Sequence, residues 1–285
     1  MYDTFAKTYD SFMDNVDYRA WADFICKTLA AHGVRDGLLL DLACGTGTLT
    51  ELLASAGFDC IGVDGSAEML QEALSKRDVS GHDILYLEQD MTGFELYGTV
   101  RAVVCACDSI NYLLNDEDLL QTFRLVNNYL DPGGIFIFDF NTENVYASIG
   151  SDTIAETRDD GSFIWENEYD PETGINESVL TLFTPVAPFA QAAPSAPAGG
   201  MAGNGLSGER PAGNGLSDGA MAAARLYEKS EEVHIQKAWS LPVIRSLLQE
   251  AGLVFECAYD GYTEAPADAA SERIVVVARE CGKHF

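Results

Sequence analysis

The sequence has few basic residues and no long apolar run. It carries 17 Lys and Arg against 45 Asp and Glu, which gives a formal net charge of −28. Such a chain repels phosphate backbones, so we expect no nucleic-acid partner. No apolar run reaches the roughly 18 residues of a membrane span, and residues 1–5 lack the basic and apolar regions of a signal peptide. We therefore expect a cytoplasmic protein without a membrane partner.

Metal-binding and disulfide patterns are also missing. The seven cysteines are odd in number, irregularly spaced and without a Cys-x-x-Cys pair or a Cys/His cluster at zinc-ligand spacing. We expect reduced thiols and no metal, because free cysteines inside apolar segments behave as small buried hydrophobes. The 285 residues, 47% of them hydrophobic, are enough to bury one substantial core with an addition.

What the sequence does contain is an apolar segment that runs into a glycine turn. Residues 38–42 are apolar apart from Asp41, and Ala43-Cys44-Gly45-Thr46-Gly47 follows them. Residues 49–56 then show helical apolar periodicity, so we predict a buried parallel strand, a tight turn and a helix N-terminus. Glycines permit φ > 0 and a close ligand, and the helix end supplies free N–H groups. The turn therefore suits a cofactor with a polar, partly anionic end.

Two features of this turn decide which cofactor it suits. A dinucleotide fingerprint needs a third glycine where this chain has Thr50, so a nicotinamide-dependent oxidoreductase remains only an alternative. Asp64 ends the next apolar segment, 17 residues after Gly47, close to the spacing of about 20 at which an acid reaches a ribose diol. The strand-Asp-x-x-x-Gly-x-Gly pattern instead resembles the first motif of class I S-adenosylmethionine (SAM) methyltransferases.

Later segments resemble the same family in the same order. Residues 84–91 end on an acid and a methionine, residues 102–106 open into a polar loop at 107–112, and a Leu-x-Pro-Gly-Gly turn at 130–134 precedes an apolar strand. The resemblance implies a Rossmann-like α/β fold, with a seven-stranded, mostly parallel sheet closed by a C-terminal antiparallel hairpin. It implies that Asp64 holds the ribose, that Asp90 bonds the adenine amino group and that Met91 packs on the ring. The implied SAM-binding residues are Tyr9, Asp41, Ala43, Cys44, Gly45, Thr46, Gly47, Asp64, Gly65, Met69, Gln89, Asp90, Met91, Cys107, Asp108 and Asn111.

The rest of the chain divides around this core. Residues 1–35 have amphipathic helical spacing and resemble the family's N-terminal lid, and residues 36–142 with 240–285 form the predicted core. Strand-like runs on both sides of a turn signal at 170–174, with a third run at 226–239, predict a small antiparallel β cap within residues 143–239. Ala, Gly, Pro and Ser dominate at about 185–224, where Ala-Gly-Asn-Gly-Leu-Ser occurs twice, which predicts a flexible low-complexity loop.

The resemblance predicts methyl transfer to an N or O of a small-molecule acceptor. Such a reaction needs alignment of the groups and exclusion of water, with an optional base. Tyr112 and His234 are the candidate catalytic residues, although capped sugar-amine N-methyltransferases commonly have a histidine about where Tyr112 stands. A SAM-binding regulator without turnover is a further alternative. The sequence leaves the acceptor and the oligomeric state open.

Overall fold

The structure is a computed structural model of the chain, and it describes residues 6, 9–10, 16–158, 161–185 and 226–283. The low-complexity loop predicted at about 185–224 lies outside the described residues apart from Pro185. Within the described part, no helix is long and apolar enough to cross a membrane.

The core is one seven-stranded sheet, as predicted. Its strands are β1 (Gly37–Leu42), β2 (Phe58–Asp64), β3 (Leu85–Glu88), β4 (Val100–Cys105), β5 (Leu130–Asn141), β10 (Leu253–Asp260) and β11 (Arg273–Glu280). Their order is β10-β11-β5-β4-β1-β2-β3, and β11 alone runs opposite to the other six strands. The strand order reverses between β1 and β4, and open α/β sheets bind ligands at such a switch point.

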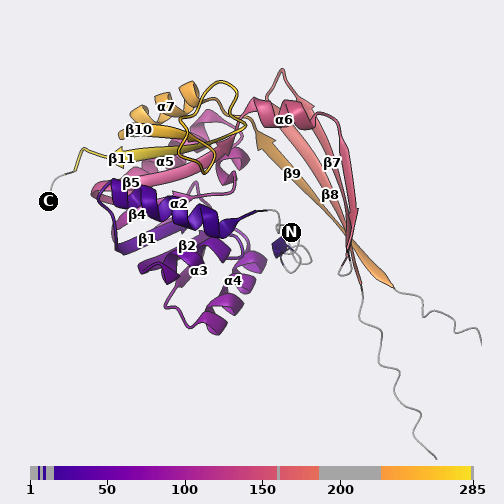
Figure 1. The fold of residues 1–285 in the computed structure, drawn as a ribbon, viewed down its shortest axis with the longest axis horizontal. Helices are drawn as coiled ribbons and strands as arrows, with labels where there is room; N and C mark the ends of the chain where they lie inside the picture. The colour runs from indigo at the N-terminus through magenta and orange to yellow at the C-terminus, as the bar shows by residue number, and fades with distance from the viewer. Residues whose placement is uncertain (1–5, 7–8, 11–15, 159–160, 186–225, 284–285) are drawn as a thin grey trace, which may run out of the picture.

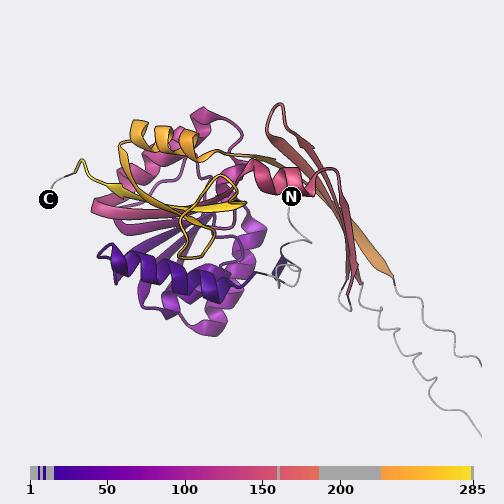
Figure 2. The same ribbon diagram turned by 45° about the horizontal axis from the view of Figure 1, so that its top comes forward.

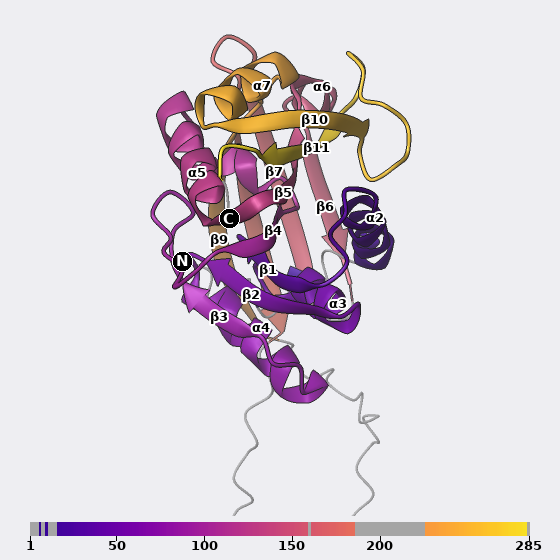
Figure 3. The ribbon, with the colours of Figure 1, turned by 90° about the vertical axis from the view of Figure 1, so that its left-hand side faces the viewer.

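Helices cover both faces of the sheet because its central strands are apolar on both sides. On one face α5 (Asp116–Tyr129) and α7 (Leu241–Glu250) bury Phe123 and Ile244. On the other, α2 (Tyr18–Ala31) and α3 (Thr48–Ser55) bury Ile25 and Leu53, while α4 (Ala67–Ser80) packs beside α3 (Figure 3). Each of these fully buried side chains contributes about 1.5–3 kcal/mol, so the two apolar layers fix the frame that positions the strand ends.

A second, four-stranded antiparallel sheet stands beside the carboxyl ends of the core strands (Figures 1 and 2). Its strands, in spatial order, are β6 (Thr153–Thr157), β7 (Ser162–Asp170), β8 (Ile175–Pro185) and β9 (Tyr227–Lys237). We call this sheet the cap. The predicted turn at 170–174 connects β7 to β8, with Gly174 at φ 72° and the carboxylate of Asp170 accepting a hydrogen bond from the Glu172 N–H at 2.9 Å.

Two elements of this region are absent from the sequence prediction. The short helix α6 (Glu143–Ile149) lies at the junction of core and cap, and β6 forms the exposed edge of the cap. Every residue of β6 is exposed, so its sequence lacks the alternation that marks a half-buried strand. Helix α6 has only seven residues, too few to show helical periodicity.

Candidate functional site

A cavity of about 690 Å³ lies between the carboxyl ends of the core strands and the inner face of the cap. Its size is within the range of about 300–1,000 Å³ found for small-molecule sites. Its wall comes from the turns after β1, β2, β3 and β4, from the N-terminal segment, and from β7, β8 and β9. The core therefore supplies one wall and the cap the other.

The glycine turn after β1 is shaped by two left-handed residues. Gly45 has φ 54° and Gly47 has φ 73°, and the Gly47 N–H donates to the Cys44 carbonyl at 3.0 Å. A Cβ on Gly47 would lie 2.5 Å from the hydroxyl of Tyr86, whereas nothing lies within 4 Å of a Cβ built on Gly45. Gly47 is thus required for internal packing, and Gly45 leaves open space where a ligand approaches the backbone.

Three non-glycine residues with positive φ also line the cavity. They are Ala43 (φ 59°), Cys107 (φ 61°) and Asp108 (φ 49°), and they lie within three residues of the ends of β1 and β4. The described part of the chain has no other non-glycine residue in this conformation. Each costs about 1–3 kcal/mol and persists only where the surroundings enforce it. Strain gathered at two neighbouring strand ends indicates a binding site rather than a packing detail.

Two buried acids stand at the ends of β1 and β2. Asp64 accepts hydrogen bonds from the backbone N–H groups of Gly45 and Ser66, each at 2.8 Å, and burial raises its pKa despite these bonds. Asp41 accepts a hydrogen bond from the Thr50 hydroxyl at 2.6 Å, and burial raises its pKa to about 7. Each oxygen of Asp64 has a second lone pair, so the carboxylate braces the turn and can still accept a bond from a ligand.

The residues after β3 lie farther along the same wall. Gln89, Asp90 and Met91 all line the cavity. The Gln89 amide is already bonded to the backbone of Glu95 through both ends, at 3.2 and 2.6 Å. Asp90 caps its own turn by accepting from the Thr92 N–H at 2.7 Å. Gln89 therefore shapes this loop, while Asp90 and Met91 present a carboxylate beside an apolar surface.

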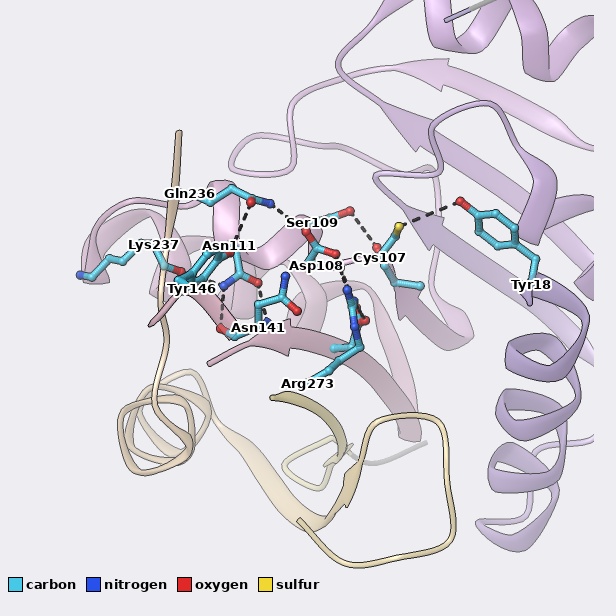
Figure 4. Close-up of polar contacts among 12 residues, drawn as sticks. Tyr18, Cys107, Asp108, Ser109, Asn111, Asn141, Tyr146, Gln236, Lys237 and Arg273 are labelled. Carbon is cyan, nitrogen blue, oxygen red and sulfur yellow. Dashed lines mark hydrogen bonds and ion pairs between the residues drawn. The ribbon is translucent and has the colours of Figure 1, made fainter. Parts of the chain in front are cut away.

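An ionic network holds the loop after β4 against the cap (Figure 4). Arg273, the first residue of β11, donates to the Asp108 carboxylate at 2.7 Å and also to Asp139 of β5. The other oxygen of Asp108 accepts from the Gln236 side chain of β9 at 2.8 Å, and the Tyr146 hydroxyl donates to Gln236 at 3.3 Å. Each oxygen of Asp108 is therefore held by a protein partner, which fixes the position of this carboxylate in the cavity wall.

Asn111, which we expected to bind the cofactor, does not line the cavity. It is fully buried, and its amide nitrogen donates to the carbonyls of Asn141 and Lys237 at 2.9 and 2.7 Å. Its amide oxygen accepts from the Asn141 N–H at 2.9 Å (Figure 4). The side chain joins core and cap, and we withdraw it from the proposed cofactor contacts.

The N-terminal segment closes one side of the cavity. Tyr9 and Tyr18 place their hydroxyls 3.8 and 4.0 Å from the Cys107 sulfur. Asp10 lies 2.5 Å from Lys76 of α4 and accepts a hydrogen bond from the hydroxyl of Thr46 at 2.7 Å. This segment is therefore tied to both the glycine turn and the loop after β4.

Tyr112 and His234 meet inside the cavity although 122 residues separate them. The Tyr112 hydroxyl lies 3.0 Å from Nδ1 of His234, and the imidazole Nε2 lies 3.9 Å from the carboxylate of Glu232. Burial lowers the pKa of His234, although Asp108 acts in the opposite direction. Burial likewise raises the pKa of Glu232 to about 7. The imidazole is thus largely neutral at pH 7.

The cavity brings together most of the residues named from the sequence. They are Tyr9, Asp41, Ala43, Cys44, Gly45, Thr46, Asp64, Gly65, Met69, Gln89, Asp90, Met91, Cys107, Asp108, Tyr112 and His234. Gly47 and Asn111 lie outside its wall. Sequence reasoning missed Arg273, whose one signal is a cation directly before the apolar run Ile274–Ala278. It also missed Asn176 and Ser178, since nothing in the sequence shows which face of β8 turns inward.

Comparison with known proteins supports one family. Residues 39–134 match the family model described as a methyltransferase domain. The chain is 31% identical over 283 residues to a protein of Geobacillus sp. (strain WCH70), covering 98% of this chain and 99% of that one. It is 40% identical over 171 residues to YqeM of Bacillus subtilis (strain 168), covering 59% of this chain and 66% of that one. Both carry methyltransferase names.

The same family appears among solved structures. An S-adenosylmethionine-dependent methyltransferase from Clostridium acetobutylicum ATCC 824 superposes with a TM-score of 0.78 at 26% identity, over 99% of each chain. The chain belongs to the class I SAM-dependent methyltransferases. This methyltransferase is also 33% identical over 141 residues to a glycine/sarcosine N-methyltransferase of Halorhodospira halochloris. It is 31% identical over 123 residues to a dTDP-3-amino-3,4,6-trideoxy-alpha-D-glucopyranose N,N-dimethyltransferase of Streptomyces venezuelae. Each match spans about half of the relative.

The residues that line the cavity of this methyltransferase are chemically suited to SAM. Open space above Gly45 admits a ligand to the backbone, and the Asp64 carboxylate faces the same cavity beside it. Asp90 and Met91 follow β3, the neighbour of β2 in the sheet. Polar and apolar groups thus follow one another along the wall as a nucleoside with a charged amino-acid tail requires.

Proposed function

We propose that this methyltransferase acts on the nitrogen of a small amine and that Tyr112 and His234 accept the proton which that amine loses. The observation that carries the proposal is their contact at 3.0 Å within the cavity that also holds the glycine turn. Tyr112 follows β4 in the core, and His234 belongs to β9 of the cap. The pair therefore stands where a group bound between the two walls would be reached from both.

The charge of the cavity favours a cationic acceptor. Its acids include Asp64, Asp90, Asp108 and Glu272. Among the described residues, Arg273 is the only Lys or Arg side chain in the wall, and it is paired with Asp108 and Asp139. The remaining acids attract a protonated amine, and because Arg273 is already paired, no cation in the described wall is left to neutralise a carboxylate of the acceptor. We therefore favour an amine without an adjacent carboxylate over an amino-acid acceptor. The acceptor then resembles that of the sugar-amine relative more than that of the glycine/sarcosine relative.

An amine that is protonated in water must lose a proton before its lone pair can attack. The amine proton passes to the oxygen of Tyr112 as the phenol gives its own proton to Nδ1 of His234. The lowered pKa of His234 leaves the imidazole neutral and able to accept at pH 7. Bound SAM would supply a methyl group activated by its sulfonium. The neutral nitrogen, held between the two walls, would be the acceptor of that group.

The cofactor would be held by the core wall. Asp64 would accept the ribose hydroxyls, Asp90 would accept the adenine amino group, and Met91 would pack on the ring. The turn at Gly45 would approach the amino-acid tail. The cap and the N-terminal segment exclude water on the opposite side, which strengthens every electrostatic contact within.

A screen of small amines with SAM tests the proposal. Mass spectrometry should reveal an amine that gains one methyl group while S-adenosylhomocysteine forms. Tyr112→Phe and His234→Ala should each lower kcat about 100- to 10,000-fold with little change in SAM affinity, the range of an acid–base contribution. Tyr97→Phe, whose side chain is fully exposed, is the matched control and should retain wild-type turnover. Methylation of a hydroxyl and of no amine would contradict nitrogen as the target atom.

A further inference from the structure

The inner face of the cap, which lines the cavity, carries several polar side chains, whereas a sheet face that only packs against a core is apolar. Alternate residues of β7, β8 and β9 line the cavity: Phe163, Trp165, Asn167, Asn176, Ser178, Leu180, His234 and Gln236. Asn176 and Ser178 are each 2% exposed, and Asn167 is 7% exposed. Buried polar groups are nearly always hydrogen-bonded, so each needs a partner.

Among the described residues that line the cavity, one fully buried side-chain oxygen lacks a hydrogen-bond partner. His234 is bonded to Tyr112, and both ends of the Gln236 amide are used by Asp108 and Tyr146. The Asn176 nitrogen donates to Asn167 Oδ1 at 3.4 Å, but its own amide oxygen has no hydrogen-bond partner among the described residues. An unpaired buried carbonyl destabilises the protein, and a ligand that supplies a hydrogen-bond donor would remove this penalty.

The surroundings of Asn176 define what kind of donor fits. Ser178 pairs with His234 across the β8–β9 ladder, so Asn176 lies two residues along the same face from the site of proton transfer. Leu180 and the half-exposed Trp165 add an apolar surface on that face. A small ring with an apolar face and hydroxyl groups at its edge satisfies both kinds of contact.

We propose that Asn176, with Ser178 beside it, is a specificity-determining site that accepts a hydrogen bond from a hydroxyl of the acceptor, which is a hydroxylated cyclic amine. This assignment rests on the proposed function, because it places the reacting nitrogen at the Tyr112–His234 pair. The Asn176 oxygen accepts a hydrogen bond from a ring hydroxyl, the Ser178 hydroxyl is available to a neighbouring one, and Trp165 packs on the ring.

A hydroxyl scan tests the assignment directly. Calorimetry on protein saturated with S-adenosylhomocysteine would use aminohexoses and aminopentoses, together with analogues that each lack one hydroxyl. One of these analogues should bind the wild type about tenfold more weakly than the parent amine does. This factor corresponds to the loss of one buried hydrogen bond. In Asn176→Leu, the parent amine should bind about tenfold more weakly, and removal of that same hydroxyl should have no further effect. Asn176→Asp, which keeps an acceptor oxygen, should restore the dependence.

Asn128→Leu, the same change on the exposed surface of α5, is the control and should match the wild type. S-adenosylhomocysteine affinity reports whether each variant is folded. Failure of every amine in the series to bind, no dependence on any hydroxyl, or the same dependence in Asn176→Leu would overturn the assignment. Since the readout is binding, an amine that binds through Asn176 but is never methylated would contradict only the proposed function. Equal methylation of hydroxylated and unhydroxylated amines would contradict only the role of Asn176.

Discussion

The side-chain amide of Gln236 lies 2.8 Å from the carboxylate of Asp108, and this contact joins the last strand of the cap to the loop after β4. The same carboxylate is held from the other side by Arg273. Asp108 is thus fixed by one partner from the core and one from the cap, and the orientation of the cap is linked to the conformation of the loop that lines the cavity.

Removing the cation from this network should destabilise the protein. Arg273→Gln leaves Asp108 and the fully buried Asp139 without a compensating charge, which should cost about 3–5 kcal/mol of unfolding free energy. Urea denaturation measures the change. Arg124→Gln, which removes a half-exposed pair with Glu250, should have little effect. Equal stability of the two variants would mean that the network carries no net energy.

Loss of the acid after β2 should weaken cofactor binding. Asp64→Ala is expected to reduce SAM affinity by about 2–4 kcal/mol if the carboxylate bonds two ribose hydroxyls. Calorimetry measures the affinity, and Asp59→Ala, an exposed acid on the same strand, is the matched control. Because Asp64 also braces Gly45 and Ser66, Asp64→Asn provides a milder test. Unchanged affinity in a folded variant would remove Asp64 from the site.

The buried Asp41 should make stability depend on pH. Burial raises its pKa from about 4 to about 7, so the native state holds this proton more tightly than the unfolded state does. Its contribution is present below about pH 4 and is lost as the pH rises to about 7. Asp41→Asn cannot ionise and should gain about 2 kcal/mol relative to the wild type between pH 5 and 8, without SAM. A constant difference across this range, measured by urea denaturation, would contradict the prediction.

The ion pair of Asp10 and Lys76 should slow the release of the cofactor. Lys76 lies 2.5 Å from Asp10 and donates to the hydroxyls of Thr46 and Thr48, so it ties the N-terminal segment to the glycine turn. Lys76→Met should raise the SAM dissociation rate about threefold. Added salt screens the ion pair in the wild type, so it should reduce the difference between the two proteins. Stopped-flow displacement measures the rate. Lys27→Met, which removes an exposed pair elsewhere, should leave it unchanged.

The low-complexity segment should be dispensable for folding. Its composition offers almost no apolar periodicity, and β8 and β9 remain paired up to Pro185 and Tyr227, so a short linker can join them. Replacing residues 191–222 with a Gly/Ser linker should keep the melting temperature within a few degrees. Loss of cooperative unfolding would show that the segment packs against the protein.

The sequence predicted the sheet because each core strand carries its own local signal. The apolar runs at Leu38–Leu42 and Ile135–Phe138 are typical of strands buried on both faces, and the acids that end several strands all face one edge. The preference for serine before a helix is equally local, and Ser66 at the start of α4 accepts a hydrogen bond from the Met69 N–H. Such local rules act within a few residues and need no tertiary information.

What the sequence could not show are contacts between residues that are distant in the chain. In the sequence Asn111 looks like an ordinary loop residue. In the structure its amide nitrogen lies 2.7 Å from the carbonyl of Lys237, which is 126 residues away in the chain. Arg273 pairs with Asp108 across 165 residues, and no periodicity marks that pairing. Asn176 faces inward only because of the register between β7, β8 and β9, which a one-residue slip would reverse.

The hydrogen bonds of Asn111 also have an evolutionary consequence. The cap leaves the core just after Asn141 and returns just after Lys237, and one buried amide fastens both crossings at a single point. A segment whose two ends meet in this way can lengthen, diverge or be exchanged between genes without altering the order of the parallel strands. Descendants of one ancestral enzyme could thus inherit the same methyl-donor machinery and acquire new acceptors by remodelling a single contiguous insertion.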